Sequence, residues 1–228
     1  MSLQKLTDSV YYYAHQPETD RPMLAYIKGG KWALAIDAGN SAAHVDEFYQ
    51  ALESAGLKLP DLTVITHWHW DHTFGMHHIH GPSVACQKTN QFLNRERDRL
   101  ADPAYEEFLK QDDECLGREY GAEGRVIAVP SDIQFEGEMI LDLGGITARI
   151  FQAEAPHSED TVLIEIPEEK LLFLGDSTSE DFYQDGYMDR GKLAKLIALI
   201  EGADCTTCIL SHTEPLGKWE LLEYLKSI

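Results

Sequence analysis

The chain has 228 residues, 43% of them hydrophobic, and a formal net charge of −20 at pH 7. This length is enough to bury a substantial core in one domain, whereas the acidic balance argues against a nucleic-acid partner, which needs basic surface. The apolar stretches are shorter than the roughly 20 residues of a membrane span, and no secretion signal opens the chain, so we expect a cytoplasmic protein with no membrane partner.

The first part of the chain predicts an antiparallel opening followed by alternating elements. Short apolar runs at 10–13, 23–28 and 32–37 indicate strands, with a hairpin turn at Gly29-Gly30. Apolar residues at helical spacing predict a helix over 42–55 that ends at Gly56. A buried strand at 62–66, a short helix at 72–80 and a strand at 83–86 follow.

The middle of the chain differs in kind from its flanks. Residues 87–123 are charged, show helical apolar spacing and are broken at Asp102-Pro103, which predicts two inserted helices. This insertion either lids a site or covers a sheet. Strands are then expected at 126–129, 133–135, 139–143, 146–152, 161–166, 171–174 and 208–210, with helices at 192–201 and 218–228. The pattern predicts an α+β fold, a four-layer αββα sandwich formed as one domain over 1–228.

The four cysteines predict no disulfide framework. They form no repeated pair pattern in a chain too large to need disulfides, so we expect reduced thiols. Cys205 and Cys208 have the spacing of a metal or redox pair, but no second pair exists. Their run into an apolar strand favours buried structural cysteines.

Potential metal ligands concentrate directly after the strand at 62–66. The string Thr66-His67-Trp68-His69-Trp70-Asp71-His72 places four of them within six residues. In an extended segment, residues two apart project to one side, so His67 and His69 can grip one ion while the tryptophans point the other way. Three further candidates, His157, Asp176 and His212, each lie in a loop at a predicted strand end, where distant parts of a chain can converge.

With these residues in place, the whole chain resembles the metallo-β-lactamase superfamily. The resemblance implies that His67, His69 and His157 hold a first metal ion, and that Asp71, His72 and His212 hold a second. Asp176 would bridge the two ions. Imidazole and carboxylate ligands suit zinc first, with iron or manganese as alternatives.

The resemblance also implies a mechanism, metal-assisted hydrolysis. Two divalent ions about 3.5–4 Å apart can share a water and lower its pKa toward 7, so that a metal-bound hydroxide attacks the substrate. Asp71 would orient this nucleophile as the catalytic residue. Asp37, at the end of a predicted strand, matches an aspartate near the family's site and is expected to receive an imidazole N–H.

Other residues carry weaker expectations. Tyr183 and Tyr187 follow Asp176 and are candidates for substrate binding, with surface packing as the alternative. Trp68 and Trp70 are expected to anchor the core. His77, His78 and His80 are expected to be solvated helix residues, because the ligand set is complete without them.

The substrate is less constrained than the chemistry. The loop at 177–187 has no lysine or arginine, which argues against a glutathione thioester. We expect hydrolysis of a small ester, lactone or thioester, with a small-molecule phosphodiesterase as the alternative enzyme. A metal-binding or scaffold protein of the same fold is the alternative from another class. A homodimer through a sheet edge or the insertion is left open.

Overall fold

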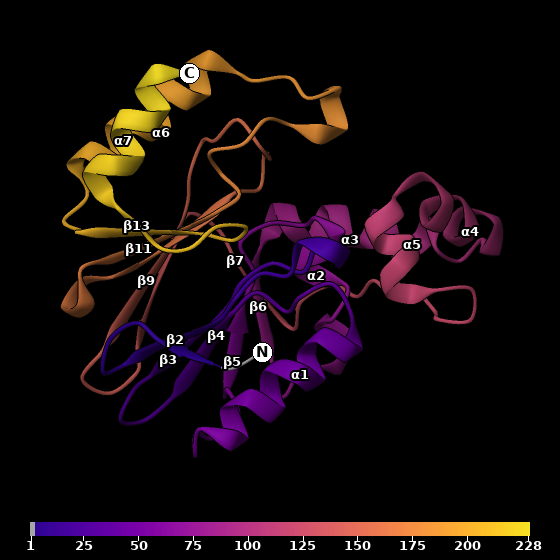
Figure 1. Cartoon of the computed structure of the whole chain (residues 1–228), viewed down its shortest axis with the longest axis horizontal. Coiled ribbons are helices and arrows are strands. Elements are labelled where there is room, and N and C mark those ends of the chain that lie inside the picture. The colour runs from indigo at the N-terminus through magenta and orange to yellow at the C-terminus, as the bar shows by residue number, and fades with distance from the viewer. Residues whose placement is uncertain (1–2) are drawn as a thin grey trace.

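The computed structural model describes residues 3–228 and shows two β-sheets packed face to face (Figure 1). Within these residues the first sheet has seven strands in the order of the chain: β1 (Gln4–Lys5), β2 (Val10–Tyr13), β3 (Leu24–Lys28), β4 (Ala33–Ile36), β5 (Leu62–Val64), β6 (Ser83–Cys86) and β7 (Ile133–Phe135). The second has six, in the spatial order β13-β12-β11-β10-β9-β8: β8 (Glu138–Asp142), β9 (Thr147–Gln152), β10 (Val162–Ile166), β11 (Leu171–Gly175), β12 (Thr207–Leu210) and β13 (Leu216–Gly217).

Helices cover the outer faces of both sheets and complete the four layers. They are α1 (Ala42–Ser54), α2 (Trp70–Thr73), α3 (Gln87–Arg99), α4 (Pro103–Asp112), α5 (Glu114–Tyr120), α6 (Arg190–Gly202) and α7 (Lys218–Ser227). Figure 1 shows α1 beneath the first sheet, α6 and α7 above the second, and α4 and α5 projecting to one side. The predicted αββα sandwich is confirmed.

Alternation along the strands explains this layering. In β3, Ala25 and Ile27 join the core between the sheets, whereas Leu24 and Tyr26 point to the other face and pack with Phe48 of α1. Successive side chains of a strand project to opposite faces, so a strand that is apolar on both faces needs cover on both. A separate apolar cluster on the outer face of the second sheet buries the contact sides of α6 and α7.

Chain direction within the sheets fixes where the loops gather. Strands β4, β5, β6 and β7 run parallel, as do β11 and β12. Parallel neighbours need a crossover connection, which α1 supplies between β4 and β5 and α6 supplies between β11 and β12. Most of the side chains described below lie after β4, β5, β11 and β12, and His157 lies in the loop between β9 and β10.

Three predicted elements are corrected by the structure. The insertion holds three helices, because Asp113 ends α4 and its carboxylate caps α5 by accepting from the backbone N–H groups of Cys115 and Leu116. Residues 126–129 form no strand: Val126 and Ala128 are buried against the insertion's own apolar cluster, which produces the alternation without a paired neighbour. The helix expected at 72–80 is instead α2 followed by a 3₁₀ turn at Met76–His78.

Two smaller expectations can also be placed. All four cysteines are free, and Cys205 and Cys208 are buried. His77, His78 and His80 are exposed, as expected of solvated residues. None of the helices in residues 3–228 combines the length and the apolar character that crossing a membrane requires.

Candidate metal centre

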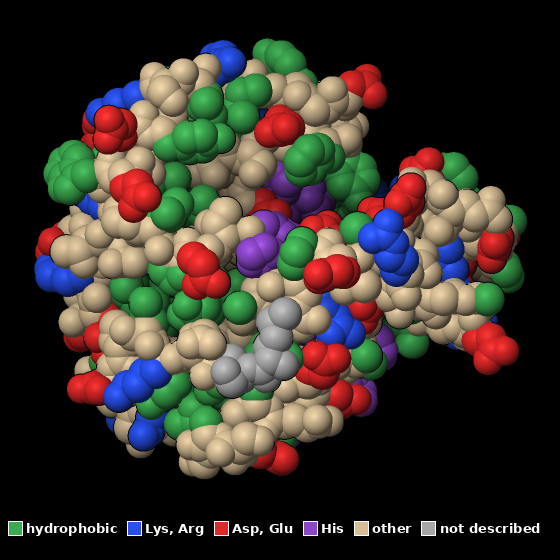
Figure 2. Space-filling model, viewed as in Figure 1, with side chains coloured by type: hydrophobic (Ala, Val, Ile, Leu, Met, Phe, Trp, Pro, Cys, Tyr) green, Lys and Arg blue, Asp and Glu red, His purple; other side chains and the backbone are tan. Residues whose placement is uncertain are grey.

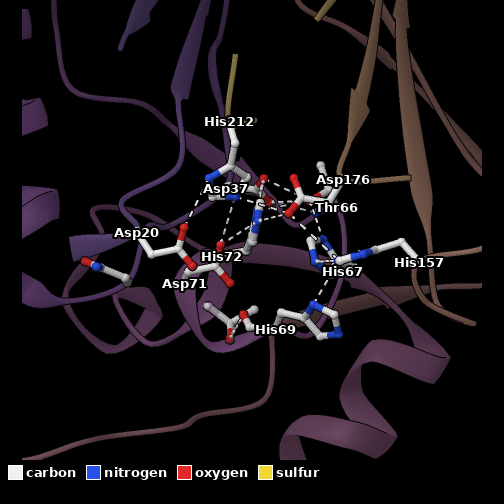
Figure 3. Close-up of polar contacts among 12 residues, drawn as sticks. Asp20, Asp37, Thr66, His67, His69, Asp71, His72, His157, Asp176 and His212 are labelled. Atoms are coloured by element: carbon white, nitrogen blue, oxygen red, sulfur yellow. Dashed lines mark hydrogen bonds and ion pairs between the residues drawn. The ribbon is translucent and has the colours of Figure 1, made fainter. Parts of the chain in front are cut away.

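Seven histidine and aspartate side chains from four loops and the short helix α2 converge between the two sheets (Figure 3). They form one group of three residues and one group of four. Within each group the potential ligand atoms all lie within 4.8 Å of one another. The first group is His67, His69 and His157; the second is Asp71, His72, Asp176 and His212. These are the seven residues that the sequence brought forward as metal ligands.

In the first group, three imidazole nitrogens point at a common centre. His157 Nε2 lies 2.9 Å from His69 Nδ1 and 3.2 Å from His67 Nε2. The opposite nitrogen of His157 lies 2.8 Å from the backbone carbonyl of Glu180, so Nδ1 donates there and Nε2 is left with its lone pair toward the centre. Burial, aided by the neighbouring histidines, lowers the pKa of His67 well below its usual value and that of His69 to about 3. Neutral, convergent imidazoles are the ligands that zinc prefers.

The second group combines two carboxylates with two imidazoles. His72 Nε2 lies 3.0 Å from Asp71 Oδ2, and His212 Nε2 lies 3.2 Å from the same oxygen. Burial alone would lower the pKa of His72, but Asp71, Asp176 and Asp37 outweigh it and raise that pKa well above its usual value. The same balance raises the pKa of His212 to about 10. The negative potential of the carboxylates thus favours a positive charge at this group of residues.

One carboxylate oxygen lies between the two groups. Asp176 Oδ2 is 3.1 Å from His212 Nε2, 3.4 Å from His72 Nε2 and 3.8 Å from His157 Nε2. Asp176 Oδ1 is buried here without a hydrogen-bond partner, and His72 Nε2 faces the carboxylates of Asp71 and Asp176 without the geometry of a hydrogen bond. Buried polar atoms left unpartnered at a convergent donor set fit a site built for cations.

Asp37 supports this centre from behind. Its Oδ2 lies 2.8 Å from His72 Nδ1 and also accepts from the Thr66 hydroxyl, and its Oδ1 accepts from the Thr66 backbone N–H at 2.8 Å. Asp37 is 2% exposed and has φ of +62°, a left-handed conformation that aspartate tolerates better than most residues. Asp37 is therefore placed to accept an N–H from His72 Nδ1, and its role in supporting a metal ligand stays a prediction.

Five of the seven candidate ligands line one end of a cavity of about 680 Å³, visible in Figure 2 as a hollow with histidines at its base. The insertion contributes the opposite wall through residues of α3, α4 and α5 and through Asp113 between α4 and α5. It therefore lines the site rather than only covering a sheet. Sequence reasoning missed the wall residues Glu96, Leu109, Asp112, Asp113 and Leu116.

The four aromatic residues named from the sequence meet different outcomes. Tyr183 lines the cavity, and its ring lies 4.8 Å from that of His69. Tyr187 is not among the lining residues: the turn from Asp181 to Tyr187 directs it outward, 60% exposed. Trp70 is buried in the apolar cluster, as expected, but Trp68 is only half-buried and lines the cavity beside His69.

Asp20 was also missed. Its Oδ1 lies 3.4 Å from His212 Nδ1, on the side away from the metal ligands (Figure 3). It lies in the loop between β2 and β3 with φ of +51°, and no motif in the sequence marks it. Only the fold brings this loop beside the loop that follows β12.

Comparison with known proteins agrees with this architecture. A sec-alkylsulfatase from Pseudomonas sp. superposes with a TM-score of 0.74 at 15% identity over 99% of this chain, which spans 40% of the sulfatase chain. A metallo-beta-lactamase from Pontibacter korlensis gives a TM-score of 0.67 at 16% identity over 100% of this chain and 99% of its own. One from Hirschia baltica gives 0.63 at 18% identity over 99% and 96%. At these identities the likeness shows the fold alone, and no curated protein matches the chain.

The sequence itself supplies the remaining link. A family model described as the metallo-beta-lactamase superfamily matches residues 24–182, which run from β3 to the loop after β11 and include six of the seven candidate ligands. The match covers more than half of the chain. The chain therefore belongs to the metallo-beta-lactamase superfamily.

Proposed function

We propose that this protein is a hydrolase with two divalent metal ions that cleaves a small ester, lactone or thioester. The observation that carries the proposal is the pair of ligand groups that meet at Asp176 Oδ2. In the proposed arrangement His67, His69 and His157 would hold one ion, Asp71, His72 and His212 would hold the other, and Asp176 lies between the two groups. A three-histidine set favours zinc, with iron or manganese as the alternatives.

Bound ions would supply a hydroxide nucleophile at neutral pH and a Lewis acid for the scissile carbonyl. The protein's own groups do the rest. Asp71 lines the cavity, so its carboxylate can accept a hydrogen bond from the attacking water and orient it. Hydrolysis adds this water across the acyl C–O or C–S bond, and its proton leaves with the alcohol or thiol. His157 and His72 stay fixed because Glu180 and Asp37 accept from their outer nitrogens.

A small-molecule phosphodiesterase is the less favoured alternative. Its anionic substrate would gain from cationic side chains, and none of the described residues lining the cavity is a lysine or arginine. A scaffold protein that has lost turnover is the other alternative, and the experiment below separates it. A homodimer and a cytoplasmic location stay predictions from the sequence.

Metal content per chain tests the proposal most directly. The protein is purified without chelator or metal-affinity resin, and elemental analysis compares the parent with His157→Ala, His212→Ala and the control His78→Ala. His78 is an exposed histidine that pairs with Asp46 outside the centre. We expect two equivalents in the parent and the control, and about one fewer in each of the other two variants.

Turnover is then measured on panels of lactones, thioesters and phosphodiesters, with Asp71→Ala as the catalytic variant. Loss of hydrolysis in folded Asp71→Ala supports the assignment. A folded parent that takes up no metal, even with added zinc or iron, would overturn the hydrolase and leave the scaffold as the better account.

A further inference from the structure

The cavity has two chemically different ends. One end holds the metal ligands, and the other is walled by the insertion and by the segment after β11. Its volume of about 680 Å³ exceeds what a scissile acyl group alone would fill and lies in the range of small-molecule sites. The part of the substrate remote from the reacting bond therefore meets the insertion.

The charge of this lining is one-sided. Apart from the candidate ligands it contains four carboxylates: Asp20, Glu96, Asp112 and Asp113. Among the lining residues within 3–228 there is no lysine or arginine to balance them. His15 also lines the cavity, but burial lowers its pKa, so it adds no positive charge at neutral pH. An anionic substrate would find no cationic side chain along this wall.

Two of the four carboxylates keep their charge available. Glu96 is already engaged, since it accepts from the Tyr105 hydroxyl at 2.7 Å and pairs with Arg99 at 3.3 Å. Asp113 uses only Oδ1 to cap α5. The Asp112 carboxylate makes no hydrogen bond or ion pair with any residue that the structure describes, and Asp112 is exposed at the cavity wall.

Aromatic rings line the same cavity, beside His69 and His157. The rings of Trp68 and Tyr183 are 4.6 Å apart at an angle of 46°, and Phe182 lies beside them in the lining. The Trp68 ring is held in place by stacking on Phe92 at 5.2 Å. Indole and phenol faces attract ammonium groups, and aromatic walls combined with carboxylates bind alkylated ammonium ions.

From this combination we infer that the substrate carries an alkylammonium group, which lies against Trp68 and Tyr183 and is paired with Asp112 and Asp113 while its acyl bond reaches the metal centre. This inference rests on the proposed hydrolase function and names its substrate class: cationic esters, lactones or thioesters. Charge pairs at a wet wall and one cation–π contact each contribute a few-fold in binding, so together they predict about a tenfold preference.

Three thioesters of similar size and different charge test the inference on the zinc-loaded protein. They are S-acetylthiocholine, its neutral carbon isostere 3,3-dimethylbutyl thioacetate, and the anionic S-acetyl derivative of 2-mercaptoethanesulfonate. Thiol release gives kcat/KM for each. We expect the cationic ester to exceed the neutral one about tenfold and the anionic one to be the poorest.

A double variant locates the effect. Asp112→Asn/Asp113→Asn removes two charges, and asparagine at 113 keeps the helix cap because its side-chain oxygen can still accept. The matched control Glu107→Gln/Glu123→Gln removes two exposed charges from the same insertion outside the cavity lining. The cationic preference should fall to about twofold in the first and persist in the control. Calorimetric titration with butyltrimethylammonium gives a second readout that needs no turnover, with weaker binding expected in the first variant alone.

The outcomes separate the two proposals. Equal rates for the three thioesters, or faster hydrolysis of the anionic one, would overturn the cationic substrate class and leave the hydrolase standing. An equal reduction of the cationic preference in Glu107→Gln/Glu123→Gln would also overturn the cationic substrate class. The preference would then come from the overall negative charge of the protein and not from Asp112 and Asp113. If metal-loaded protein hydrolyses none of them, thioester hydrolysis fails, and the calorimetry decides: binding that depends on Asp112 and Asp113 supports the ammonium site, and no binding overturns it.

Discussion

Asp37→Asn should weaken metal binding while leaving the fold intact. The native carboxylate accepts three hydrogen bonds, from His72 Nδ1 and from the backbone N–H and hydroxyl of Thr66. Asparagine has the same shape and tolerates the left-handed backbone at φ +62°, so the substitution adds no steric strain. It replaces one accepting oxygen with an NH₂ group, which must face either His72 Nδ1 or the Thr66 N–H.

Either orientation costs the centre a buried hydrogen bond. If the NH₂ group faces His72, the imidazole must carry its proton on Nε2, the nitrogen that points at the second ligand group. Loss of the group that accepts a hydrogen bond from a metal-binding histidine typically lowers metal affinity 10- to 100-fold, which is about 1.4–2.7 kcal/mol. Competition with a chromogenic zinc chelator measures this directly, and we expect a loss in that range for the site that contains His72.

Asp132→Asn is the matched control. Asp132 accepts from the backbone N–H of Ser83 at 2.8 Å and from its hydroxyl at 2.9 Å, which repeats the Asp37–Thr66 pattern without a histidine. Its substitution should leave zinc affinity unchanged. If Asp37→Asn binds zinc as tightly as the parent, while His212→Ala loses about one equivalent, then orientation of His72 by Asp37 does not stabilise the centre and the reasoning is refuted.

Three further predictions concern stability. Removing bound metal with a chelator should lower Tm and zinc should restore it, because the ligands converge only in the folded state; a Tm independent of metal would contradict this. Gly75→Ala should cost about 1–3 kcal/mol in urea unfolding, since a Cβ there would lie 2.1 Å from the Ala38 carbonyl oxygen; an unchanged midpoint would show that the packing yields freely. Burial raises the pKa of Glu106, but a hydrogen bond from the backbone N–H of Val126 and the cations of Lys110 and Arg125 outweigh burial. The pKa of Glu106 is therefore below its usual value of 4.5. A carboxylate whose pKa is lowered in the folded state stabilises the protein above about pH 4.5, and this stabilisation is lost as the pH falls below that value. The free energy of unfolding should therefore depend less on pH in the acid range in Glu106→Gln than in the parent. Equal slopes of unfolding free energy against pH would contradict the assignment.

The sequence was sufficient to find the seven candidate ligands because most of them lie at a strand end. His67 and His69 follow β5, Asp176 follows β11 and His212 follows β12. Apolar runs reveal buried strands, and loops at one sheet edge share a location, so local pattern and topology point to the same place. The superfamily match and the sandwich were accessible for the same reason.

The cavity wall formed by the insertion could not be predicted from the sequence in this way. The apolar spacing in 87–123 is equally compatible with a lid and with helices that cover a sheet. It predicts that one face of each helix is buried, but it does not predict which part of the protein that face contacts. The false strand at 126–129 has the same origin, because Val126 and Ala128 are buried by the insertion. Trp68 alternates with His67 and His69 as in an extended strand, but the chain turns into α2 at Trp70, and the two-residue period no longer sets its direction.

A buried ionic network determines where this wall stands relative to the metal centre. Arg21, 8% exposed, donates to both oxygens of Glu119 on α5, at 2.8 and 3.0 Å, and to Glu47 on α1 at 2.9 Å. Glu119 also accepts from the Ser41 hydroxyl that caps α1. The side chains of Arg21 and Glu119 are both buried, so removing either one leaves the charge of the other uncompensated, which costs about 3–5 kcal/mol. Arg21 adjoins Asp20 in sequence, so the network that secures α5 also places the carboxylate beside His212. One set of charges therefore joins α5 of the insertion to α1 and to the loop that carries Asp20 beside His212.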